Sequence, residues 1–174
     1  MLGLFRKKVP YEELGYMYAD SLLATTVQEL ASSTMEWTGR ELDTEQVGRD
    51  LAILALSFFQ MTLMNTVPKE YASSRVLGGF MQRTQERYAN FAFDPTTSAI
   101  GGDYIRIAAI DLRNKNRIGN FPTLVPSATA RITGLSKADQ YWPNALAQVD
   151  AFIQIVIQTA TQAVEVTKAN ARLV

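Results

Sequence analysis

The side chains that could perform chemistry in this chain are mainly carboxylates, because the residues most enzymes depend on are absent. Its 174 residues include no histidine and no cysteine. This excludes Ser-His-Asp and Cys-His nucleophilic sites, the usual zinc sites and Glu-x-x-His di-iron sites. Two carboxylate pairs have helical spacing, Glu41 with Glu45 and Glu13 with Asp20. Such pairs could hold Mg²⁺ between helices.

These pairs do not form a convincing catalytic set. All-α nucleotide pyrophosphohydrolases use Glu-Glu pairs with further closely spaced acids, and the chain lacks that pattern. Glu41 and Glu45 also stand at a predicted helix start, where acids stabilise the helix through its dipole. The phosphate-binding patterns GxxxxGK[ST] and GxGxxG are absent as well. The sequence predicts no catalytic residue, no metal site and no cofactor. A carboxylate enzyme that uses Mg²⁺ is kept as the second alternative to the function that the whole sequence favours.

Composition indicates one globular domain. Hydrophobic residues make up 47% of the chain and charged residues 20%, with a net charge of zero. A chain of this length can bury a core without disulfides, and its charge balance does not call for nucleic acid as a partner. We expect a flexible N-terminus over residues 1–9 and a single helical domain over residues 10–174.

The periodicity of apolar residues predicts an all-α fold, a bundle of about five helices. The helices are expected over residues 10–39, 43–64, 69–90, 97–115 and 136–168. Capping boxes at Asp43 and Ser136 mark helix starts, and Gly39 marks a helix C-terminus. The segment at 97–115 could also form a strand. The segment at 116–135 is expected to be an irregular loop, because two prolines four residues apart interrupt a helix.

The second and fifth predicted helices are expected to form the centre of the bundle. The stretch "LAILALSFFQMTLM" at 51–64 is apolar nearly all round and shorter than the roughly 20 residues a membrane span needs. It is therefore either buried on several sides or covered by a partner. Leu51, Leu54 and Phe58 lie on one face of this predicted helix, and Ile53, Leu56 and Met64 point the other way, here called the second face. Leu56 and Met64 are interaction candidates.

Two Gly-Gly pairs occur in helical settings, in "RVLGGFMQR" at 75–83 and "AIGGDYIR" at 99–106. A glycine inside a helix costs about 1 kcal/mol relative to alanine, so the pairs are either tolerated or allow a close approach. The first pair is expected off the core face, beside two arginines, where an outside partner could reach it. The interaction candidates here are Arg75, Gly78, Gly79, Arg83, Gly101, Gly102 and Arg106.

Charge is segregated along the chain. Residues 12–50 carry nine acids and only two bases, whereas bases outnumber acids over residues 69–137. Stacking of acidic on basic surfaces between copies is therefore conceivable. A basic cluster around the end of the fourth predicted helix adds three interaction candidates, Arg113, Lys115 and Arg117.

Residues 1–10, "MLGLFRKKVP", lack the apolar core of a signal peptide. With no transmembrane helix expected, the predicted localisation is cytoplasmic. Peripheral membrane association is an alternative, because apolar residues precede basic ones in this segment. The residues concerned are Leu2, Leu4, Phe5, Arg6, Lys7 and Lys8.

These observations favour a non-enzymatic helical interaction or assembly protein that associates with a protein partner, itself included. The first alternative is a binder of an apolar small molecule or a membrane surface.

Overall fold

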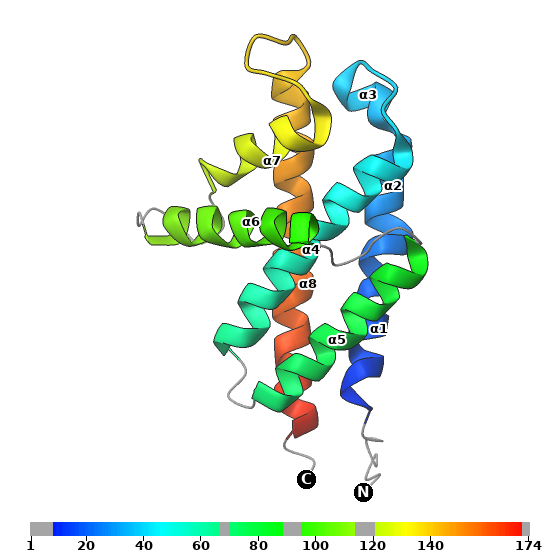
Figure 1. The fold of residues 1–174 in the computed structure, drawn as a ribbon, viewed down its shortest axis with the longest axis vertical. Coiled ribbons are helices and arrows are strands. Elements are labelled where there is room, and N and C mark those ends of the chain that lie inside the picture. Colours follow the sequence, from blue (N-terminus) through cyan, green and yellow to red (C-terminus); the bar gives the residue numbers. More distant parts are fainter. Residues whose placement is uncertain (1–8, 67–69, 89–94, 114–120, 172–174) are drawn as a thin grey trace, which may run out of the picture.

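The computed structural model describes residues 9–66, 70–88, 95–113 and 121–171, and every regular element in these ranges is helical. The fold is all-α, as the sequence predicts (Figure 1). In chain order the helices are α1 (Tyr11–Ser21), the π-helical segment η1 (Leu22–Val27), α2 (Gln28–Ser32), α3 (Thr34–Thr38), α4 (Thr44–Thr66), α5 (Glu70–Arg87), α6 (Pro95–Arg113), α7 (Leu124–Thr133) and α8 (Trp142–Ala171).

Helix α4 is a central element of the fold. It contacts α8, α6, α5, α7, α2 and η1. Its second face is covered by the chain itself, because Ile53 and Leu56 are only 6% and 8% exposed. Aromatic rings reinforce the packing. The ring centroids of Phe59 and of Phe80 in α5 are 4.5 Å apart, and those of Phe58 and Phe121, which pack edge to face, are 5.3 Å apart. Of the two sequence readings, burial on several sides therefore holds for most of this helix.

Residues 44–65 of α4 have the length and mean hydropathy of a membrane span, although no transmembrane helix is expected from the sequence. The most apolar window of this helix is 72% buried inside the fold. The core helix of a soluble protein meets the same criteria, so this helix carries little weight as evidence for a membrane.

Helix α8 runs along the long axis of the molecule, beside α1, and α6 lies across that axis (Figure 1). The start of α1 and the end of α8 lie at one end, whereas α3 and the turn between α7 and α8 lie at the other. The segment that could have been a strand is helix α6. The first predicted helix is interrupted at Ser33, whose φ of −102° and ψ of 19° separate α2 from α3.

The prediction of an irregular segment over residues 116–135 is wrong for its second half, where α7 forms. Pro126 is tolerated because it occupies the first turn of α7, whose backbone N–H groups have no partner within the helix. The Asp111 carboxylate, at the end of α6, accepts hydrogen bonds from the Thr123 and Leu124 N–H groups at 3.0 and 2.9 Å. A side chain from the preceding helix therefore caps α7.

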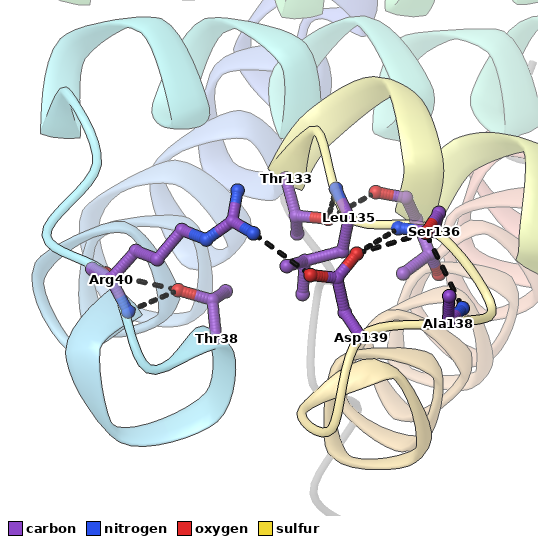
Figure 2. Close-up of polar contacts among 8 residues, drawn as sticks. Thr38, Arg40, Thr133, Leu135, Ser136, Ala138 and Asp139 are labelled. Carbon is purple, nitrogen blue, oxygen red and sulfur yellow. Dashed lines mark hydrogen bonds and ion pairs between the residues drawn. The ribbon is translucent and has the colours of Figure 1, made fainter.

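Helices α3 and α7 end in the same way, with a threonine followed by a glycine at a φ of 67°. The Thr38 hydroxyl donates to the Thr34 carbonyl and accepts from the Arg40 N–H, and Thr133 does the same with Thr129 and Leu135. The loops that follow are tied together by the Arg40–Asp139 ion pair at 2.9 Å (Figure 2).

The residues of the predicted capping box, Ser136 and Asp139, form a turn before α8 and do not cap the helix directly. In this turn the Asp139 carboxylate accepts hydrogen bonds from the Ser136 N–H and hydroxyl groups. Helix α8 itself begins three residues after Asp139, at Trp142. The Ser136 contacts and Arg40 together hold the pKa of the Asp139 carboxyl below its ordinary value.

Replacing Asp111 with alanine should destabilise the fold by about 1–2 kcal/mol, because α7 loses the acceptor for two backbone N–H groups. Asp111→Asn keeps one oxygen acceptor and should cost less. Urea denaturation of both variants measures the difference. Equal losses would contradict a capping role.

Candidate interaction surface

Helices α1 and α5 pack so closely that two glycines are required at their contact, here called the α1–α5 seam. A Cβ atom on Gly79 would lie 2.8 Å from the carbonyl carbon of Glu12. A Cβ atom on Gly15 would lie 2.6 Å from the backbone nitrogen of Phe80. Real Cβ atoms essentially never come so near a backbone. Each helix therefore presents a glycine to the backbone of the other.

Polar pairs flank the α1–α5 seam on the surface. Arg75 pairs with Glu12, and this contact lowers the pKa of the Glu12 carboxyl. Arg83 binds both carboxylate oxygens of Asp20, at 2.7 and 3.1 Å. Arg83 also pairs with Glu86 at 2.8 Å. Part of the charge segregation along the chain is therefore neutralised inside one molecule.

The sequence placed the glycines at 78 and 79 off the core face, open to an outside partner. For Gly79 this is wrong, because the approaching backbone belongs to α1 of the same chain and Gly79 is buried. Gly78 is exposed, and a Cβ there would meet nothing within 4 Å. Arg75 and Arg83 flank the glycines as expected, but acids of α1 occupy them.

The second glycine pair has a different environment. Gly101 and Gly102 line a surface groove of about 370 Å³ between α4, α5 and α6, here called the α6 groove. Leu56 lines the same groove, so three of the sequence candidates come together there. No charged side chain is among its described lining residues, which are Ile53, Leu56, Ser57, Gln60, Leu77, Met81, Thr97, Ser98, Gly101, Gly102 and Ile105.

The other sequence candidates are dispersed. Met64 is 51% exposed near the end of α4. Arg106 pairs with Asp103 at 3.2 Å on an exposed part of α6, and Arg113 is exposed at the end of that helix. Lys115 and Arg117 lie outside the described residues. So do residues 1–8, which are most of the predicted flexible segment 1–9 and include the residues of the membrane-association alternative.

Among the described residues, the carboxylate pairs gain no third side chain that could complete a metal site. Glu13, Glu41 and Glu45 are exposed, and Asp20 is held by Arg83. Within the described ranges, no group of three histidine, cysteine or acidic side chains could hold a metal ion.

Sequence reasoning missed a buried polar region between α4 and α6. Asp50 and Tyr104 are 8% and 3% exposed. Burial raises the pKa of both groups, and the negative charge of Asp50 raises that of Tyr104 further. Among the described atoms, the Tyr104 hydroxyl has no hydrogen-bond partner. The sequence signal was slight, since Asp50 sits next to the apolar run of α4.

Comparisons with protein-family models, curated proteins and solved structures found no match.

Gly79→Ala should destabilise the fold by about 1–3 kcal/mol, because the new methyl group overpacks the α1–α5 seam. The adjacent Gly78→Ala is the matched control. It should stabilise the fold by up to about 1 kcal/mol, because alanine favours a helix and the site is open. Chemical denaturation of the two variants measures both effects. A gain of stability in both would contradict the close packing of α1 and α5.

Asp50→Asn should change how stability depends on pH. The folded pKa of Asp50 lies above 3.8, its ordinary value, despite the Gln46 hydrogen bond and the charges of Arg131 and Arg49. Its contribution to stability is thus present below the unfolded pKa and is lost as the pH rises through the folded pKa. An asparagine at position 50 does not titrate, so the variant does not lose this contribution to stability as the pH rises.

We therefore expect the free energy of unfolding of Asp50→Asn, relative to wild type, to increase from acid to neutral pH. Urea denaturation across this range tests it. A constant difference would contradict a raised pKa.

Proposed function

We propose that this protein is a non-enzymatic interaction protein that associates with a second copy of itself through the α6 groove. The observation that carries this proposal is a surface recess, formed partly by small residues of α6, with no charged side chain among its described lining residues. Ser98, Gly101 and Gly102 line that recess beside Leu56.

The face of α6 in this groove suits the packing of another helix. Gly102 and Ile105 lie on one side of α6, and Leu112 follows Ile105 by seven residues and so lies close to the same side. Leu112 is 45% exposed and extends this apolar row along α6 beyond the groove. Glycine and serine let a second backbone come near, and the exposed leucine offers apolar surface for burial.

A second copy is the occupant that the chemistry of α6 favours. An uncharged groove accepts an uncharged helix face, and α6 itself carries such a face. Two copies related by a two-fold axis would each place α6 against the groove of the other, which is the isologous arrangement of most dimers.

Gly102→Leu tests the proposal. A side chain at this position enters open space, since a Cβ there meets nothing within 4 Å. We expect the dissociation constant of the dimer to rise about tenfold or more, a loss of roughly 1.4 kcal/mol, because leucine fills the recess. Light scattering across a dilution series of the full chain gives this constant.

Gly78→Leu is the matched control, because Gly78 is also an exposed helical glycine with nothing within 4 Å and does not line the α6 groove. Both variants should melt at or above the wild-type temperature, since each replaces a helical glycine. Equal association of wild type and Gly102→Leu would refute the α6 contact. A wild-type chain that is monomeric throughout the series would refute self-association.

A further inference from the structure

A second groove, of about 570 Å³, lies between the α2–α3 region and the first half of α8, and is here called the acidic groove. Its apolar lining includes Ile155, which is 41% exposed, and two buried rings, those of Phe152 and Trp37. The Trp37 indole N–H donates to the Leu30 carbonyl at 3.0 Å, which fixes the ring in the lining.

The charges that line the acidic groove have one sign. Glu29 and Glu36 both line it and are exposed, and no arginine or lysine is among its described lining residues. Other acids of the same acid-rich segment, Glu12 and Asp20, are neutralised by α5. The acidic groove therefore combines apolar surface with the negative charges of Glu29 and Glu36, whereas the arginines of α5 pair with Glu12 and Asp20.

We propose that residues 2–8 of a second copy of this chain dock in the acidic groove. This segment has the complementary composition, with apolar Leu2, Leu4 and Phe5 followed by basic Arg6, Lys7 and Lys8. The apolar side chains would bury mainly against Ile155, which is the exposed apolar side chain among the three named. The basic side chains would meet Glu29 and Glu36, and opposite charges of this kind fix the register of a docked segment.

The same segment cannot place its charges there within one molecule. Glu29 stands 18 residues after Tyr11 along α1, η1 and α2, or about 27 Å at 1.5 Å per helical residue. Lys7 precedes Tyr11 by four residues, which reach at most about 14 Å when fully extended. Figure 1 shows the start of α1 and helix α3 at opposite ends of the molecule, and Glu36 lies in α3. The contact therefore joins two copies.

This contact is head-to-tail, since the docked segment and the acidic groove are different surfaces. Such a contact propagates into rings or filaments, whereas the α6 contact closes a dimer. The inference rests on the proposed self-association and adds to it a second interface with its own chemistry.

Reversing the charges on each side tests the contact. Lys7→Glu/Lys8→Glu and Glu29→Lys/Glu36→Lys should each weaken head-to-tail association about tenfold or more, because like charges then face each other. Mixing the two variants should restore association, because the acidic segment of one fits the basic groove of the other. Sedimentation velocity of the full chains, alone and mixed, measures both effects.

Glu41→Lys/Glu165→Lys is the matched control, since it makes the same charge change at two exposed acids that do not line the acidic groove. It should associate as wild type does. Association of wild type should also weaken with added salt.

Failure of the mixture to associate, or wild-type association of the Lys7→Glu/Lys8→Glu variant, would overturn the inference. Either result leaves the α6 contact standing if Gly102→Leu still weakens association. Conversely, sensitivity to charge reversal without sensitivity to Gly102→Leu would keep the head-to-tail contact and reject the α6 contact. A monomeric wild type would overturn both.

Discussion

The fold depends on the need to cover α4 on nearly every side. A helix that is apolar all round cannot leave a wide face in water without losing the free energy of burying it. Helices α5, α6, α7 and α8 therefore pack around it, together with α2 and η1. Most of the architecture follows from this one requirement.

The close contact between α1 and α5 shows a different kind of constraint. Its geometry is set by the absence of side chains at Gly15 and Gly79, and the ion pairs of Arg75 and Arg83 line its surface. These exposed pairs contribute modestly to stability, but they occupy charges that a partner could otherwise have used. The α1–α5 seam thus makes Glu12, Asp20, Arg75 and Arg83 less available to a partner.

Two surfaces with unlike chemistry result. The α6 groove has no charged residue in its described lining, and the acidic groove carries Glu29 and Glu36. The first suits a helix with small and apolar side chains, and the second suits a basic segment with apolar neighbours. An assembly that uses both would combine a contact governed by shape with one governed by charge, and salt would weaken only the second.

The sequence by itself determined the fold class, the central place of α4 and α8, and the end of the first helical region at Gly39. It also determined the capping of α4 at Asp43, whose carboxylate accepts hydrogen bonds from the Glu45 and Gln46 N–H groups. These features depend on periodicity and on local backbone preferences, which a chain carries wherever it folds. It also brought forward Leu56, Gly101 and Gly102, which the structure places together in the α6 groove.

Only the tertiary structure decided how the two glycine pairs differ. Both pairs occur in similar sequence settings, yet Gly79 meets the backbone of Glu12, whereas Gly102 meets nothing within 4 Å. The helix at 124–133 was likewise missed, because two prolines four residues apart indicated a loop. Pro126 instead lies in the first turn of this helix, and Asp111 from another helix caps its N-terminus. What decides these cases is the neighbour that packing brings to a residue, and that neighbour lies far away in the sequence.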